Sequence, residues 1–351
     1  MAEGKNLVGV DIGSSSIKVC QLKESRRGLA LAKIGYAPLP PQAVADGQIM
    51  NRGAVVETLE RLFRDAQIKQ REVALSVSGQ AVIIRKITIP LIPPEQLDEQ
   101  IQWEAEQHIP FDIKEVHVDY EVLRRRPESG QMDLVLVAAK KEDINGYASI
   151  ARDAKLKPMV VDIDAFTVQN VFESSRGLPP DHTVALINLG ASLSSLNIVS
   201  RGVSAFTRDI ANGGNTITEE IQKQLGLPYD QAEAYKTQTD AAGLLPQRVV
   251  DIIRAASDTI AGEIQRSLDF FMATSGDGEL SRIYVTGGSA NLPQLVSAIE
   301  ARARVPVEVF SPVEKIAVDP RDVDVNLVQS RAAQLAVALG LALRKDREKR
   351  A

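Results

Sequence analysis

One short sequence pattern occurs twice in this chain of 351 residues, at 10–19 and again at 187–196. Each copy has an apolar strand, an acid or its amide, a glycine, a small hydroxyl-rich turn and a second strand with alternating apolar residues. Such a hairpin presents backbone N–H groups and hydroxyls around a tight concavity that binds anions. Two copies therefore predict two similar halves with a nucleotide held between them.

The composition indicates a globular protein of about two domains. Charged residues make up 25% and apolar residues 44%, which excludes a disordered chain. A net charge of -5 gives no electrostatic case for a nucleic-acid partner. No apolar run approaches the roughly 18 residues of a membrane span, and residues 1–5 have no signal-peptide character. The single cysteine, Cys20, is expected in the core of a cytoplasmic protein.

Predicted strands and helices alternate along the whole chain. Two similar sets are expected, with strands at 7–12, 17–23 and 28–36 before a helix at 53–67, and strands at 184–189, 194–200 and 203–210 before helices at 214–225, 229–237 and 246–274. The segment at about 85–155 has its own strands and helices and is interpreted as an inserted subdomain. We therefore predict an α/β fold with a first domain at 1–84 and 156–180, the insertion at 85–155, a second domain at 181–327, and a C-terminal helix and charged tail at 328–351.

The first hairpin carries residue types that suit phosphate and metal binding. Asp11 ends a strand beside the turn, where a carboxylate is suited to hold Mg²⁺ through water. Gly13 lets the backbone approach a phosphate, and Lys18 supplies a positive charge. An ordinary hairpin with a polar turn is the alternative, and the second copy of the pattern favours the nucleotide site.

Two further segments of the second half suit ribose or base binding. Gly213 and Gly214 precede a helix, and a free helix N-terminus binds anions, although a tight turn with a threonine cap is equally compatible. Glu233 and Lys236 lie three residues apart on one helix face, either bracketing a ribose or forming a solvated ion pair. Between a later strand and helix, Gly287 and Gly288 leave room for a flat base, which is a weak signal alone.

The order of these elements is more specific than any one of them. From about residue 6 to 343 the chain resembles the actin-like ATPase superfamily: first phosphate hairpin, connecting helix, second phosphate hairpin, ribose segment and adenosine Gly-Gly. This resemblance implies two duplicated α/β domains with ATP and Mg²⁺ in the cleft between them.

The resemblance also implies roles for individual residues. Asp11, which would hold the metal, is joined as a catalytic candidate by Asp162 and Asp164 near the connecting helix. The nucleotide contacts it implies are Gly13, Ser14, Ser15, Ser16 and Lys18 in the first hairpin, Asn188, Gly190, Ala191 and Ser192 in the second, and Gly213, Gly214, Glu233, Lys236, Gly287, Gly288 and Ser289 around the ribose and adenine.

One position departs from the superfamily pattern. Members normally carry aspartate where this chain has Asn188, and an amide lacks the charge that helps to position a metal-bound water. Loss of one well-placed catalytic group commonly costs about two to four powers of ten in rate. We therefore expect ATP to act as a ligand that sets conformation, with slow hydrolysis or none.

The inserted segment resembles the FtsA and PilM branch of the superfamily. Its sequences QWEAE at 102–106, IPF at 109–111 and LVLVAAK at 134–140 are similar to PilM-type type IV pilus assembly proteins. That resemblance implies a cytoplasmic protein at the inner membrane that binds the N-terminal tail of a PilN-type membrane protein and contacts other pilus assembly components, including the assembly ATPase. The charged segment 344–351, which has no apolar face, favours PilM over FtsA. An active ATPase or phosphotransferase and an FtsA-like filament-forming division protein are the alternatives.

The only tryptophan of the chain lies in the inserted segment. On an ideal helix Leu97, Ile101, Ala105 and Ile109 form one stripe, and Trp103 points away from it. Trp103 is expected either to pack against the parent domain or to line the groove for the PilN-type tail.

Overall fold

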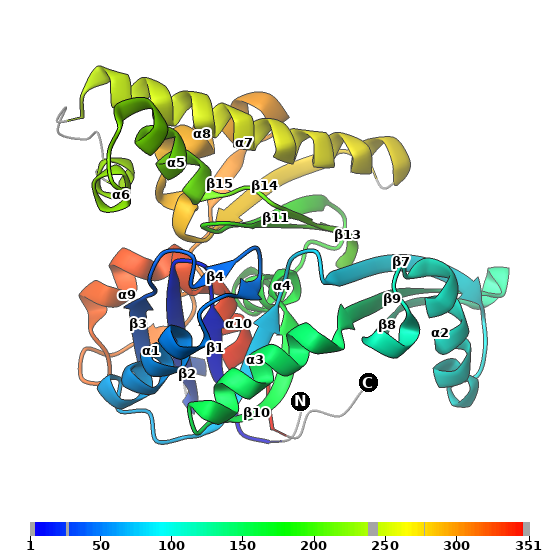
Figure 1. The fold of residues 1–351 in the computed structure, drawn as a ribbon. Coiled ribbons are helices and arrows are strands. Elements are labelled where there is room, and N and C mark those ends of the chain that lie inside the picture. Colours follow the sequence, from blue (N-terminus) through cyan, green and yellow to red (C-terminus); the bar gives the residue numbers. More distant parts are fainter. Residues whose placement is uncertain (1–3, 26–27, 238–244, 277, 347–351) are drawn as a thin grey trace.

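The computed structural model describes residues 4–25, 28–237, 245–276 and 278–346. Two α/β domains are stacked on each other, and a smaller unit projects from their side (Figure 1). This arrangement confirms the predicted α/β fold with two similar halves and an insertion.

The first domain is built on a six-stranded sheet. Its strand order is β10-β6-β1-β2-β3-β16. The strands are β1 (Val8–Ile12), β2 (Ser16–Ser25), β3 (Gly28–Pro38), β6 (Glu72–Val77), β10 (Lys157–Ile163) and β16 (Ala317–Val318), with a small hairpin of β4 (Val44–Ala45) and β5 (Gln48–Ile49) beside them.

Helices cover both faces of this first sheet. On one face lie α1 (Arg52–Asp65) and α3 (Lys141–Asp153), and on the other α4 (Asp164–Arg176) and α10 (Ala336–Ala342). Helix α1 forms because Asn51 caps its first turn and an apolar stripe faces the sheet. Helix α10 packs so closely on β1 that a Cβ at Gly9 would lie 1.9 Å from the carbonyl oxygen of Ala338.

The second domain repeats the strand arrangement of the first. Its order β13-β12-β11-β14-β15 matches β3-β2-β1-β6-β10, with the same mixture of antiparallel and parallel pairs. The strands are β11 (Thr183–Leu189), β12 (Ser194–Ser200), β13 (Val203–Ile210), β14 (Leu280–Thr286) and β15 (Val307–Val309). The helices are α5 (Gly214–Leu225), α6 (Tyr229–Thr237), α7 (Gln247–Thr274) and α8 (Pro293–Ala303).

The inserted unit is a three-stranded antiparallel sheet with one helix on it. Strand β9 (Gln131–Lys140) lies between β7 (Val82–Pro90) and β8 (Val116–Arg126). Helix α2 (Pro94–His108) buries Leu97, Ile101 and Ala105 against one face of this sheet. The other face is mixed: Ala139 and Val137 near one end of β9 pack with the core of the first domain, and Asp133 near the other end is polar.

Two predicted domain boundaries differ from the structure. Helix α3 buries Ile150 and Ala151 in the core of the first domain, so the inserted unit ends near Lys140 rather than at 155. The return to the first sheet begins with β16, before the predicted boundary at 327. The charged tail is described only to Asp346, and residues 347–351 lie outside the described part of the chain.

The predicted single helix at 328–343 is wrong, because the segment is divided. It consists of α9 (Val325–Arg331), a 3₁₀ turn (Ala332–Leu335) and α10. Because the helix is interrupted here, the carbonyl of Ala333 can accept hydrogen bonds from another segment of the chain. That carbonyl accepts bonds from the Gly287 N–H and the Thr286 hydroxyl, both at 2.8 Å, so the break ties the C-terminal segment to the second domain.

Candidate functional site

The two predicted hairpins face each other across one cavity of about 600 Å³ between the domains. Its lining contains most of the residues singled out from the sequence. These are Asp11, Gly13, Ser14, Ser15, Ser16, Lys18, Asp164, Asn188, Gly190, Ala191, Glu233, Lys236, Gly287, Gly288 and Ser289. We call this cavity the cleft.

The hairpins are closed by the same hydrogen bond in each half. The Gly13 N–H donates to the Ser16 carbonyl at 3.1 Å, and the Gly190 N–H donates to the Leu193 carbonyl at 3.0 Å. Each turn therefore directs its remaining backbone N–H groups and small side chains toward the cleft, the arrangement that binds oxyanions. A Cβ at Gly190 would lie 2.5 Å from the Leu193 oxygen, so this turn needs glycine.

A carboxylate and an ammonium group meet at the base of the first hairpin. Lys18 Nζ lies 3.1 Å from Asp11 Oδ2, and both side chains are largely buried. Because Asp11 and Lys18 are paired in register on neighbouring strands, their side chains emerge on the same face. Within the described residues no three histidine, cysteine or acidic side chains gather as a metal site. A single carboxylate at Asp11 fits Mg²⁺, which keeps most of its waters.

The equivalent position of the second hairpin carries no charge. Asn188 pairs in register with Ser195, as Asp11 pairs with Lys18. The second half thus presents an amide and a hydroxyl where the first half presents an ion pair. The asymmetry leaves the first hairpin as the side suited to a metal.

Asp164 begins helix α4 and lines the cleft. Burial raises the pKa of its carboxyl to about 7, and the negative charge of Asp11 contributes in the same direction. The hydroxyls of Ser76 and Ser78 oppose the shift by bonding to the carboxyl. A carboxyl that titrates near neutrality in a cleft is suited to take or give a proton.

The structure does not support Asp162 as a cleft residue. Its Oδ2 accepts a hydrogen bond from Arg344 Nη1 at 3.0 Å, and its Oδ1 accepts from the Ile163 N–H. Side chains alternate across a strand, so Asp162 on β10 ties the C-terminal segment to the sheet. It does not line the cleft.

Three of the predicted contacts stand just behind the cleft surface. Ser192 accepts a hydrogen bond from Asn215 Nδ2 at 3.2 Å. The Gly214 N–H donates to the Gly190 carbonyl at 3.0 Å, which joins the start of α5 to the second hairpin. A Cβ at Gly213 would lie 2.6 Å from the Ala191 oxygen, so Gly213 permits this close approach.

Glu233 and Lys236 form a partly buried pair rather than a solvated one. Lys236 Nζ lies 2.6 Å from Glu233 Oε2 and donates to the Gly214 carbonyl at 3.2 Å. Burial lowers the pKa of the Lys236 ammonium, and the charge of Glu233 opposes the shift. Thr218 donates to Glu233 at 2.7 Å, which fixes the pair against α5.

The Gly-Gly segment needs its glycines for contact with the second hairpin. Gly287 has φ +92°, and a Cβ there would lie 2.4 Å from the Leu189 oxygen and 2.6 Å from Asn188 Oδ1. The Ser289 hydroxyl donates to the Gly190 carbonyl at 2.9 Å. The start of α5, the second hairpin and the segment around Gly287 are therefore joined into one wall of the cleft.

Sequence reasoning missed several groups that line the cleft or stand beside it. The guanidinium of Arg331 lies 4.4 Å from the ring centre of Tyr36, and both line the cleft from the first domain. Asp209 on β13 accepts from the Gly79 N–H at 2.5 Å and from the Ser195 hydroxyl at 2.6 Å, which links the two domains. No local motif marks such residues, because they converge only through the tertiary fold.

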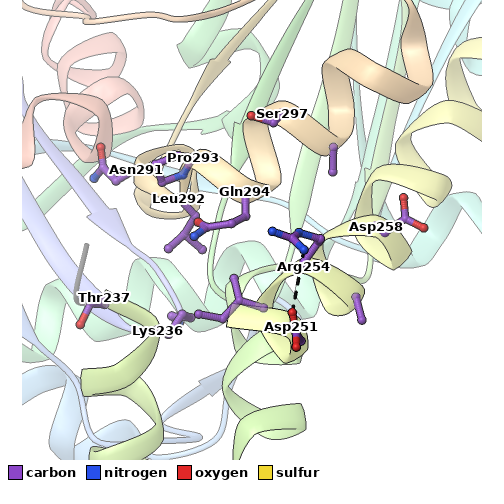
Figure 2. A pocket seen from close by; sticks show the side chains of 13 residues that line it. Lys236, Thr237, Asp251, Arg254, Asp258, Asn291, Leu292, Pro293, Gln294 and Ser297 are labelled. Carbon is purple, nitrogen blue, oxygen red and sulfur yellow. Dashed lines mark ion pairs between the residues drawn. The ribbon is translucent and has the colours of Figure 1, made fainter. Parts of the chain in front are cut away.

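A second cavity of about 1140 Å³ opens beside the cleft, between α6, α7 and α8 (Figure 2). Lys236, Thr237, Asn291 and Leu292 border both cavities. Arg254 and Asp251 on α7 form an ion pair within it. The cleft thus continues past its Gly-Gly wall into a wider, open space.

The inserted unit leaves its tryptophan uncovered. The side chain of Trp103 is 63% exposed, so the expectation that it packs against the parent domain is wrong. Among the residues that the structure describes, no helix is long and apolar enough to cross a membrane.

Comparison with known proteins decides the family. The family model described as type IV pilus assembly protein PilM matches residues 9–346. The chain belongs to the PilM family. A solved structure titled "PilM-PilN type IV pilus biogenesis complex" is 30% identical, covers 99% of this chain and 100% of its own, and superimposes with a TM-score of 0.86.

More distant relatives share the fold of this PilM family member. The cell division protein FtsA of Bacillus subtilis is 23% identical over 87% of this chain and 78% of its own length. The structure of MreB5 of Spiroplasma citri bound to ADP is 12% identical, covers 96% of this chain and 94% of its own, and has a TM-score of 0.53. These likenesses confirm the predicted actin-like fold.

Proposed function

We propose that this protein is a nucleotide-binding scaffold of type IV pilus assembly that binds the N-terminal tail of a PilN-type inner-membrane protein. The observation that carries the proposal is the likeness to the PilM-PilN complex over 99% of the chain, together with the family match. FtsA is a more distant relative, so a filament-forming division protein is the weaker alternative.

The cleft supports ATP and Mg²⁺ as its ligands. Two facing hairpins with backbone donors suit a polyphosphate, and Gly287 and Gly288, which line the cleft, would offer their backbone to a flat base. Asp11 would hold the metal, with Lys18 beside it for phosphate charge. When bound, Mg²⁺ would neutralise phosphate charge.

The charges of the cleft favour binding over turnover. Asn188 supplies no negative charge at the second hairpin, and Asp164 is largely protonated below its raised pKa of about 7. Both features weaken activation of a water molecule. We infer slow ATP hydrolysis or none, with the bound nucleotide setting how the two domains are held.

Such a partner would bring the protein to the membrane. A scaffold that binds the cytoplasmic tail of an inner-membrane protein would be peripheral at the cytoplasmic side of that membrane. Other pilus assembly components, including the assembly ATPase, would then be linked to the membrane complex through it.

Isothermal titration calorimetry with a synthetic N-terminal tail of the PilN-type protein of the same organism tests the proposal. We expect saturable one-to-one binding, and no binding of a peptide with the same composition in scrambled order. Equal binding of both peptides, or of neither, would contradict the scaffold role.

A further inference from the structure

A small cavity of about 180 Å³ lies between the face of the inserted sheet opposite α2 and the turn that joins β12 to β13. We call it the junction pocket. Positive charge dominates its lining, since it has four cationic side chains and one carboxylate. Its lining residues are Lys86, Leu123, Arg124, Arg126, Asp133, Ser200, Arg201 and Val203.

The one carboxylate of the junction pocket is already bonded. Asp133 Oδ1 accepts from Arg126 Nη2 at 2.5 Å and from the Thr88 hydroxyl at 2.7 Å. Arg126 Nε is buried without a partner among the described residues. Asp133 is therefore engaged by Arg126, Lys86 has an interaction partner of its own, and Arg124 and Arg201 add positive charge around the space.

Arg201 lines the junction pocket from a backbone conformation that is unfavourable for residues other than glycine. Arg201 has φ +52° and is followed by Gly202 with φ +78°. A two-residue hairpin turn with both φ values positive favours asparagine and glycine, not arginine. The chain therefore accepts an unfavourable residue type at the turn that borders the junction pocket.

We propose that the junction pocket binds an acidic segment of a partner protein, whose Asp or Glu side chains enter between Arg124 and Arg201. The apolar side chains of Leu123 and Val203 suit the methylene groups of such residues. Because β7 and β8 belong to the inserted unit and the turn belongs to the second domain, the bound segment would fix one unit against the other.

An acidic peptide fits this place better than a membrane or a nucleic acid. The pocket is a recess between two units, which a flat bilayer does not enter. The chain as a whole carries a net charge of -5, and helix α2 on the other side of the same sheet has five acidic residues and no lysine or arginine. Extended polyanions are repelled by that charge, whereas a short segment contacts only the local positive patch.

Fluorescence anisotropy with a labelled hexaglutamate peptide at low salt tests the proposal with the full chain. We expect Arg124→Glu and Arg201→Glu each to weaken binding about ten-fold or more, and raised salt to weaken it in the wild type. Arg125→Glu is the matched control, because Arg125 is paired in register with buried Met132 and does not line the pocket. It should change binding less than about three-fold.

Two further arms separate the possible sources of negative charge. Inorganic phosphate should not displace the peptide at matched ionic strength, and vesicles of phosphatidylglycerol should not sediment the protein. The proposal is overturned if hexaglutamate does not bind, if the three variants weaken it equally, or if Arg124→Glu instead abolishes phosphate or vesicle binding. Unchanged circular dichroism and unchanged binding of the PilN-type tail would show that the variants are folded.

Discussion

Asp11 and Asn188 occupy equivalent positions in the two halves of the molecule, each on the first strand of its hairpin and each lining the cleft. One is a carboxylate that pairs with Lys18 at 3.1 Å, and the other is an uncharged amide. This difference is the physical reason to expect little turnover of a nucleotide bound in the cleft.

Restoring the missing charge should raise the rate of chemistry. We expect Asn188→Asp to increase single-turnover hydrolysis of ATP by about ten-fold or more, because one positioned carboxylate commonly contributes at least that factor. Rapid-quench measurement with saturating protein gives this rate directly. Asn188→Ala is the control and should not increase it, and an unchanged rate in Asn188→Asp would show that another step limits hydrolysis.

Asp164 should make stability depend on pH in a defined direction. Its pKa is about 7 in the folded protein and near 3.8 when unfolded, so the native state binds more protons between these values. The stabilisation is complete below about pH 4 and is lost as the pH rises through 7. The slope is at most about 1.4 kcal/mol per pH unit.

The comparison of two proteins isolates this effect from the neighbouring Asp11 and Asp209. Urea unfolding of wild type and Asp164→Asn between pH 5 and 8 should show the variant gaining stability relative to wild type as the pH rises. A constant difference across that range would contradict the raised pKa.

Gly287 should be intolerant of a side chain. A methyl group there meets the Leu189 oxygen at 2.4 Å in a backbone with φ +92°, so Gly287→Ala should cost about 2 kcal/mol or more of unfolding free energy. Gly130→Ala is the matched control, because Gly130 also has positive φ but has nothing within 4 Å. It should cost only about 1 kcal/mol. Equal losses in urea unfolding would mean that the close approach at Gly287 is absent.

Trp103 is expected to report binding of the PilN-type tail. As the only tryptophan and 63% exposed, it should change its emission when the tail peptide binds. Trp103→Ala should weaken binding by about 2 kcal/mol, since exposed tryptophans often carry much of an interface, whereas Trp103→Phe should retain part of it. Tight peptide binding with unchanged emission and unchanged affinity of Trp103→Ala would place the groove elsewhere.

Local patterns predicted the elements of the fold well, because each hairpin and each amphipathic helix is specified by residues close in sequence. The same holds for the cleft residues that belong to a motif, such as Gly13, Lys18 and Gly190. The prediction that Asp162 belongs to the site was wrong. Asp162 and Asp164 are two residues apart, but they point to different sides because the strand ends and a helix begins between them. The role of helix α3 and the break at Ala333 depend on contacts with distant parts of the chain.

Groups that meet only in the folded molecule left no local signal. Arg331 and Tyr36 are about 300 positions apart, and Asp209 reaches the backbone of Gly79 across the domain junction. The junction pocket joins residues of the inserted sheet to a turn of the second domain. In each case the sequence supplies the chemical group, and only the tertiary arrangement supplies its partner.

Calorimetric titration of Mg-ATP into protein freed of bound nucleotide tests the central claim most directly. We expect wild type to bind one Mg-ATP, Asp11→Ala to bind at least about ten-fold more weakly, and Asp162→Ala to bind like wild type, because Asp162 pairs with Arg344 outside the cleft. Absence of Mg-ATP binding at millimolar concentrations in the wild type, or equal weakening by both substitutions, would contradict a nucleotide site between the two hairpins.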